Sequence, residues 1–98
     1  MHSWARSAVG PPRRPLRPPT VLAELAPGQR ATIVGVVPEA SALVAGRLRQ
    51  LGFRPASDVE VIRRAPLGDP TVYRVQDTEL CLRRREARLI EVDPRNGA

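Results

Sequence analysis

Few side chains of this 98-residue chain can act as nucleophiles, general bases or metal ligands. The sequence contains one histidine, His2, and one cysteine, Cys81, and it has no lysine. Because the histidine lies in the N-terminal segment, neither a Ser-His nor a Cys-His couple can be built in the rest of the chain. The Gly-rich phosphate loop with its lysine is also missing, which argues against nucleotide hydrolysis. We therefore predict that the protein is not an enzyme.

The cysteine and the carboxylates are better explained by structure than by chemistry. Cys81 stands between Leu80 and Leu82 on a predicted strand, and no second cysteine is available for a disulfide or a metal pair. We expect it to be a small packing residue in a reducing cytoplasm. Four carboxylates, none spaced as in a Ca²⁺ loop, are expected to cap turns or face solvent: Asp58, Glu60, Asp69 and Asp77. The sequence predicts no bound metal and no cofactor.

The densest charged segment is 83–88, which contains four arginines. Arg63 and Arg64 are expected nearby across the sheet, whereas Glu86 and Glu91 interrupt the positive charge. This is the one place in the predicted domain where an anion or an acidic partner is expected to dock. The alternative, which we rank first, is ordinary solvated surface charge.

Nucleic-acid binding is the second function class that the composition raises. The net charge is +6 and the isoelectric point is about 11.4. Four arginines and no acid lie in residues 1–19, which leaves twelve arginines against ten carboxylates, or +2, for residues 20–98. Only Trp4, Phe53 and Tyr73 are aromatic, so few rings are available to stack on bases. We therefore expect nucleic-acid binding to be a weaker hypothesis than protein contact.

One helix, predicted over 41–53, and the strands around it must position these charged and aromatic side chains. Val44, Leu48 and Leu51 fall at i, i+4 and i+7 and form one apolar stripe. Ser41 is suited to cap the first turn, and Gly52 is suited to the left-handed residue that ends the last one. Because three turns are marginal alone, the stripe is expected to pack on a sheet.

Strand patterns fill most of the remaining sequence. Strands are predicted at 30–37, 58–65, 71–75, 79–83 and 88–92, with the middle three forming an antiparallel meander. The alternation of the second strand slips at Ile62, which indicates a bulge or a bend. Residues 84–87 are expected to form one helical turn, and Leu22 and Leu25 are expected to cover one end of the core.

Five short strands and one inserted helix predict a mainly β protein, a small and strongly bent barrel. We predict a disordered Arg/Pro-rich tail over 1–19, a single domain over 20–94 and a frayed end over 95–98. The chain has no apolar run of the eighteen or so residues that a membrane helix needs. Its N-terminus carries charges and prolines where a signal peptide has its apolar core, so neither membrane insertion nor export is expected.

Three motifs together resemble the FeoA family of small cytoplasmic proteins. They are the RLxxLGF pattern at 47–53, the APLGDP sequence at 65–70 and the LRRREA sequence at 82–87. The resemblance covers essentially all of residues 20–92. It implies an SH3-like β-barrel that works without catalysis as an accessory or regulator of FeoB, a membrane ferrous-iron transporter with its own GTPase domain. The family is also similar to the C-terminal module of iron-dependent repressors, which leaves a metal-regulation alternative open.

The sequence departs from the family pattern at three places. Gly46 stands where a basic residue is common, Ala56 where glycine is usual, and the turn at 76–78 lacks the glycine often found there. These changes bear on the tightness of two turns rather than on the fold.

A docking surface is predicted between the end of the helix and the loop at 66–70, with Phe53 and Leu67 partly exposed. The competing interpretation, at even odds, is that both residues only close the barrel. The predicted partner-binding residues are Arg47, Leu51, Phe53, Pro66, Leu67, Asp69 and Arg83.

Overall fold

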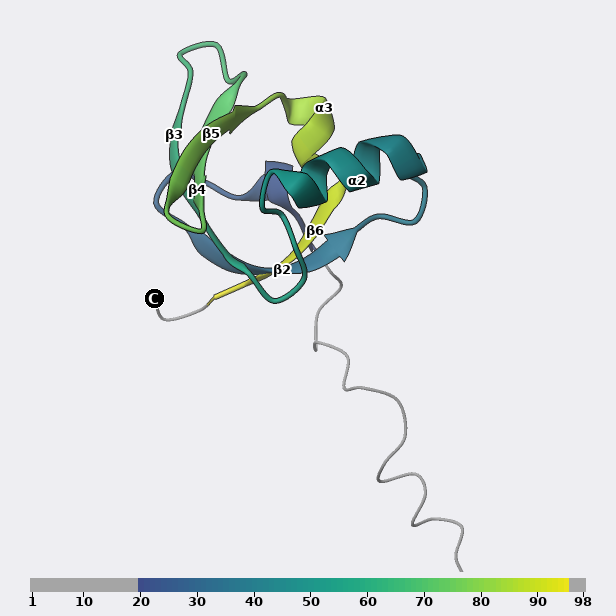
Figure 1. Cartoon of the computed structure of the whole chain (residues 1–98). Coiled ribbons are helices and arrows are strands. Elements are labelled where there is room, and N and C mark those ends of the chain that lie inside the picture. Colours follow the sequence, from purple (N-terminus) through teal and green to yellow (C-terminus); the bar gives the residue numbers. More distant parts are fainter. Residues whose placement is uncertain (1–19, 96–98) are drawn as a thin grey trace, which may run out of the picture.

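The computed structural model describes residues 20–95, so the predictions for residues 1–19 and for the last three residues lie outside the described part of the chain. Figure 1 shows a strongly curved sheet with one longer helix beside it. In chain order the elements are β1 (Thr20–Val21), η1 (Leu22–Glu24), β2 (Arg30–Val36), α2 (Ala42–Gln50), β3 (Asp58–Arg64), β4 (Thr71–Val75), β5 (Thr78–Leu82), α3 (Arg84–Ala87) and β6 (Ile90–Pro94).

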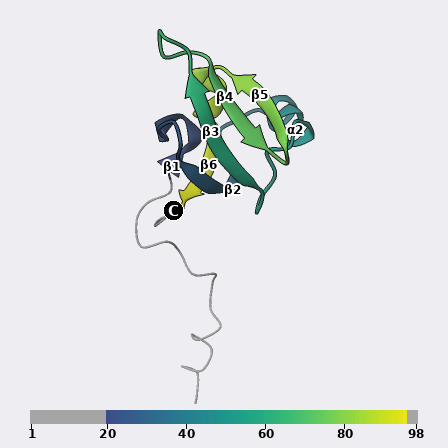
Figure 2. The same ribbon diagram turned by 90° about the vertical axis from the view of Figure 1, so that its left-hand side faces the viewer.

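All strands join one antiparallel sheet in the order β1-β6-β2-β3-β4-β5. The predicted meander is confirmed as β3-β4-β5, which crosses the front of the view in Figure 2. The hydrogen-bonded ladder does not close between β1 and β5. The short helices η1 and α3, which contact each other, lie in this gap, since η1 also contacts β6 and α3 also contacts β5. The mainly β class with one inserted helix is thus confirmed.

Two bulges bend the sheet. The register of β3 against β4 shifts between Val61 and Arg63, so the slip at Ile62 is a bulge, one of the two outcomes that the sequence indicates. A second shift lies in β2 between Ile33 and Gly35. Because a bulge inserts an unpaired residue and increases the local twist, these two sites allow a short sheet to wrap around a small core.

The core contains the apolar residues that face the inside of this curved sheet. Leu22 and Leu25, predicted to cover one end, are both buried. They pack with Ile33, Val61, Tyr73 and others in one cluster of buried residues. Ile90, rather than Leu89, is the fully buried residue at the start of the last strand.

Three details of the predicted strands are wrong. A two-residue strand, β1, pairs with β6, so the sheet has six strands rather than five. The last strand spans Ile90–Pro94 rather than 88–92, because the helical turn of α3 extends to the residues before it. Cys81 is exposed and therefore not a packing residue. The period-2 alternation that buries Leu82 necessarily points Cys81 to the other face of β5.

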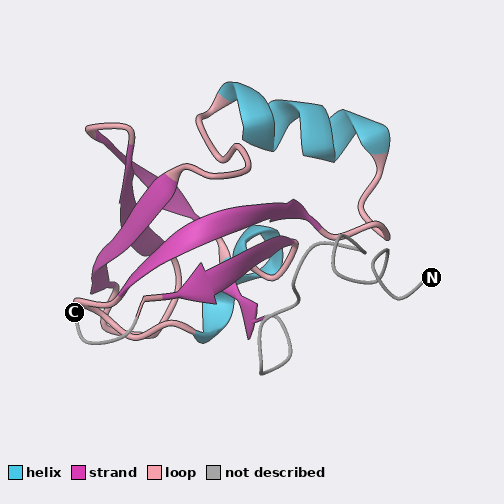
Figure 3. Ribbon diagram, turned by 90° about the horizontal axis from the view of Figure 1, so that it is seen from below, coloured by secondary structure: helices cyan, strands magenta, loops and turns pink. Residues whose placement is uncertain are grey.

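The helix α2 lies alongside the sheet, as Figure 3 shows from below. Ser41 caps its first turn, because its Oγ accepts a hydrogen bond of 3.2 Å from the Val44 N–H. Leu48 is the buried residue of the helix, whereas Leu51 is 44% exposed, so the predicted stripe is only partly in the core. Among residues 20–95 no helix is long and apolar enough to cross a bilayer.

Candidate partner-binding surface

The loop between β3 and β4 is fixed by its own backbone and by the helix that follows β5. The Ala65 N–H donates to the Pro70 carbonyl at 3.0 Å, and the Gly68 N–H donates to the Ala65 carbonyl at 2.7 Å. The Asp69 carboxylate accepts a hydrogen bond of 2.9 Å from the Arg84 N–H at the start of α3. These bonds hold the loop so that Leu67 is 96% exposed at its tip. Leu67 is therefore exposed, as predicted.

Two carboxylates, one from α3 itself and one from the loop at 66–70, cap the start of α3. The Arg83 N–H donates to Glu86 Oε1 at 2.9 Å, while Asp69 accepts from the next N–H along the chain. Both carboxylates thus satisfy amides that the first helical turn leaves unpaired. The side chains of Arg83, Arg84 and Arg85 remain exposed around this turn.

The end of α2 is a Schellman motif, and it explains one wrong prediction. The Phe53 N–H donates to the Leu48 carbonyl at 3.1 Å and the Gly52 N–H donates to the Arg49 carbonyl at 3.0 Å. Gly52 has a φ of 115°. Such motifs place an apolar contact between the two residues that Phe53 and Leu48 represent here. Phe53 is 0% exposed, so its predicted exposure is wrong and it belongs to the core.

The predicted groove between the helix end and the loop at 66–70 is not formed, because the two lie at opposite ends of β4. Gly52 lies beside Val75 and Gln76 at the end of that strand, whereas Gly68 lies beside Arg84 near its start. A strand advances about 3.3 Å per residue, so the four steps of β4 separate the two regions by about 13 Å. The loop instead adjoins α3.

A different groove lies between α2 and α3, and we call it the α2–α3 groove. Its volume is about 430 Å³, and it is lined by Val44, Arg47, Leu48, Arg85, Glu86 and Leu89. Of the predicted residues, Arg47 lines it directly. Leu51 caps the C-terminal end of the same helix, and Arg83 precedes the α3 residues that line the groove. The loop at 66–70 reaches this region through the bond between Asp69 and Arg84.

The residues of the groove that were not predicted come from two distant parts of the sequence. Val44 and Leu48 were visible as a helical stripe, and residues 84–87 as a helical turn. Nothing in the one-dimensional pattern indicated that Arg85 and Leu89 would face a helix some forty positions earlier.

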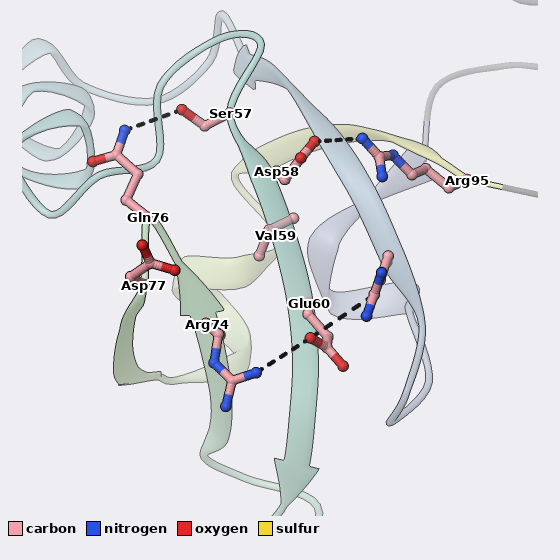
Figure 4. A pocket seen from close by; sticks show the side chains of 9 residues that line it. Ser57, Asp58, Val59, Glu60, Arg74, Gln76, Asp77 and Arg95 are labelled. Carbon is pink, nitrogen blue, oxygen red and sulfur yellow. Dashed lines mark hydrogen bonds and ion pairs between the residues drawn. The ribbon is translucent and has the colours of Figure 1, made fainter. Parts of the chain in front are cut away.

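A second hollow, of about 340 Å³, lies on the outer face of β2, β3 and β4 (Figure 4). Most of its charges are paired, because Arg74 and Arg30 approach Glu60 at 3.5 and 3.9 Å, and Arg95 approaches Asp58 at 2.8 Å. Arg74 also contacts Glu79 at 2.9 Å. These exposed pairs contribute little stability each, about 0 to 1 kcal/mol, and leave little net charge to attract a ligand.

Arg64 and Tyr73 form the one partly buried polar arrangement near the loop. Arg64 Nη2 donates to the Leu25 carbonyl at 2.6 Å and its Nε donates to Thr71 Oγ1 at 3.3 Å. Burial raises the pKa of Tyr73 above its ordinary value of 10.0, against the opposing effects of a hydrogen bond with Thr71 and of the nearby Arg64 charge. The phenol is therefore neutral at physiological pH and acts as a core residue.

Metal ligands are not gathered in the described part of the chain. Among residues 20–95 no three side chains of histidine, cysteine, aspartate or glutamate lie close enough together to hold an ion. Exposed arginines and leucines lie around the α2–α3 groove and the loop at 66–70.

Comparison with known proteins shows which family and which solved structures the chain is similar to. The FeoA domain model matches residues 20–94. The Fe(2+) transport protein A/Fe(2+) transporter FeoB fusion protein of Porphyromonas gingivalis is 39% identical over 72 residues, which are 74% of this chain and 8% of that protein. The chain thus spans less than a tenth of the length of this curated relative.

Two solved structures are similar over most of the chain. The solution structure of the FeoA protein from Chlorobium tepidum is 37% identical with a TM-score of 0.72, and the match covers 81% of this chain and 73% of that one. The crystal structure of Stenotrophomonas maltophilia FeoA complexed with zinc, described as a prokaryotic SH3 domain protein, is 32% identical with a TM-score of 0.67. That match covers 76% of this chain and 89% of the other. The predicted SH3-like fold is confirmed.

Proposed function

Because the chain belongs to the FeoA domain family, we propose that it is a cytoplasmic accessory protein that contacts a FeoB-like ferrous-iron transporter and regulates it. FeoA domains are associated with Fe(2+) transport and are non-catalytic. The observation that supports the contact best is the Porphyromonas gingivalis relative, in which the matching segment is part of a fusion with FeoB. Fusion keeps two domains at high effective concentration, and a separate chain must obtain the same proximity by binding.

The surface supports a role through contact. Leu67 at the loop tip and Leu51 at the end of α2 are exposed apolar residues, and the exposed arginines of α3 adjoin the loop. Exposed apolar side chains with charged neighbours are typical of partner sites. Five exposed residues form the proposed contact surface together with Asp69, which fixes the loop: Arg47, Leu51, Pro66, Leu67 and Arg83.

Base stacking receives no support from the described residues. The two aromatic side chains within residues 20–95, Phe53 and Tyr73, are both buried. A nucleic-acid function would therefore depend on arginine contacts to phosphates, and it predicts binding that weakens steeply with salt.

The experiment that tests the proposal is capture of the cytosolic domain of FeoB from the same organism by the full chain. We expect the wild-type protein to retain FeoB and Leu67→Glu to retain much less, because a buried leucine contact contributes about 1.5 to 3 kcal/mol. Val34→Glu, at another exposed apolar residue on β2, is the matched control and should behave as the wild type. Failure of the intact protein to bind FeoB would reject the proposal, and salt-sensitive DNA or RNA binding in its place would favour the alternative.

A further inference from the structure

The α2–α3 groove combines an apolar floor with a basic rim. Leu48 is buried at its base, and Val44 and Leu89 are partly buried beside the core. Arg47 from α2 and Arg85 from α3 are exposed on its two sides. An apolar floor of this kind accepts aliphatic side chains, and a basic rim accepts carboxylates.

The apolar surface continues from the groove along α2. Leu43 is 81% exposed and Leu51 is 44% exposed. With Arg47 they stand at i, i+4 and i+8, so they follow one side of the helix. The helix therefore presents a row of leucines interrupted by an arginine, next to the stripe of Val44 and Leu48.

The rim is positive on balance, because Arg47 and Arg85 line the groove together with one carboxylate, Glu86. All four ion pairs among residues 20–95 lie elsewhere, on β2, β3, β4, β5 and Arg95. The nearest carboxylates, Glu86 and Asp69, accept hydrogen bonds from backbone amides of α3. Six arginines lie on or directly beside α2 and α3, and none of them belongs to these ion pairs: Arg47, Arg49, Arg83, Arg84, Arg85 and Arg88.

We propose that the α2–α3 groove binds an acidic amphipathic segment of a protein partner. Aliphatic side chains of that segment would lie on Val44, Leu48 and Leu89, and its carboxylates would approach Arg47 and Arg85. This inference rests on the proposed function and gives the contact with FeoB a location and a chemistry. Residues 1–19 of this chain are a poor occupant, because they carry four arginines and no acid.

The test is a titration of the full chain with a synthetic helical peptide of leucine and glutamate, followed by fluorescence anisotropy and by amide NMR shifts. The same peptide with lysine in place of glutamate is the charge control. We expect the acidic peptide to shift amides of α2 and α3 and the basic peptide to bind at least about tenfold more weakly. Equal binding of both peptides, or shifts confined to other elements, would overturn the proposal.

Charge reversal separates this site from the rest of the surface. The double variant Arg47→Glu/Arg85→Glu should lose at least about tenfold in affinity for the acidic peptide and gain affinity for the basic one. Arg63→Glu changes an exposed arginine on β3 outside the groove and should leave both affinities unchanged. Self-association of the protein through the groove, detected by sedimentation and abolished by the acidic peptide, would reassign the site to a second copy and contradict a separate partner.

The FeoB capture assay distinguishes failure of the groove proposal from failure of the proposed function. If FeoB binds the wild type and the Arg47→Glu/Arg85→Glu variant equally, the groove is not the contact site although the proposed function stands. If FeoB does not bind at all, the proposed function fails, and the peptide titration still decides whether the groove accepts an acidic segment.

Discussion

The Asp69 carboxylate accepts a hydrogen bond of 2.9 Å from the backbone N–H of Arg84, fifteen positions later in the chain. Two of the motifs that resemble the FeoA family, APLGDP and LRRREA, therefore meet at this bond. Because Asp69 takes the place of a local capping side chain, it fixes the loop at 66–70 to the start of α3. The bond positions the exposed Leu67 relative to the arginines of α3.

Removal of this acceptor should loosen the loop and the helix together. We expect Asp69→Ala to lower the free energy of unfolding by about 1 kcal/mol, which is typical for the loss of a capping side chain. Asp69→Asn keeps an acceptor oxygen and should cost less. The measurement is urea denaturation followed by circular dichroism, and Asp93→Asn, at an exposed position on β6, is the control. An Asp69→Ala protein as stable as the control would show that the bond does not contribute.

The left-handed backbone at Ala56 is the next testable feature. Its φ is 74°, a conformation that glycine adopts without strain and that costs other residues about 1 to 2 kcal/mol. We expect Ala56→Gly to stabilise the protein by about 0.5 to 1 kcal/mol, because the relief of strain exceeds the added entropy of the unfolded chain. Ala45→Gly, in the middle of α2, is the matched control and should destabilise by about 1 kcal/mol. Destabilisation by both changes would contradict the strained geometry at Ala56.

Because of Tyr73, the stability of the fold should depend on pH in the alkaline range. Burial raises its pKa in the folded state above 10.0, the value expected when the chain is unfolded. A raised folded-state pKa means that the neutral phenol stabilises the fold fully below pH 10 or so, and that this contribution is lost as the pH rises through the folded-state value. As the protein has one tyrosine, phenolate absorbance reports this residue alone. We expect the phenol of Tyr73 to ionise at a higher pH in the folded protein than in the protein unfolded by denaturant. We also expect Tyr73→Phe to reduce the loss of stability at alkaline pH.

Arg64 opposes that shift, so its replacement extends the same experiment. Its positive charge lowers the pKa of Tyr73, although less than burial raises it. We expect Arg64→Met to raise the pKa of Tyr73 further. The same change removes the bonds to the Leu25 carbonyl and to Thr71 Oγ1, and hydrogen bonds to charged groups are worth about 1.5 to 3 kcal/mol each. Thermal denaturation should therefore show a lower midpoint, and an unchanged tyrosine titration would argue against electrostatic contact.

Local patterns predicted the elements of this fold well. The Ser41 cap, the bulge at Ile62, the strand 71–75 and the helical turn 84–87 each depend on residues close in sequence. The position of the partner surface could not be read in this way. The loop at 66–70 and the end of α2 were expected to meet, but the length of β4 separates them, and only the folded sheet shows which ends of the strands coincide.

Burial at the ends of elements was the other source of error. Phe53 follows a helix and was expected to be exposed, but the Schellman geometry turns it toward Leu48 and the core. Cys81 was expected to pack, yet it lies on the outer face of β5. In both cases the local backbone conformation, a turn at Phe53 and a strand at Cys81, decides whether the side chain is buried or exposed.

Gly46 offers a last test, in which the stability of α2 is changed without touching the groove. A Cβ placed on Gly46 would meet only Arg49 Nη2, at 3.9 Å, so alanine fits in the helix. We expect Gly46→Ala to raise the free energy of unfolding by about 1 kcal/mol, the difference in helix propensity between the two residues. Gly52→Ala is the contrasting control, because Gly52 has a φ of 115° and its Cβ would lie 3.4 Å from Val75; this change should destabilise the protein.

Since Gly46 does not line the α2–α3 groove, Gly46→Ala should bind the acidic peptide as the wild type does. Weaker binding by this more stable variant would mean that α2 must move to admit the peptide, and the groove would then not be preformed.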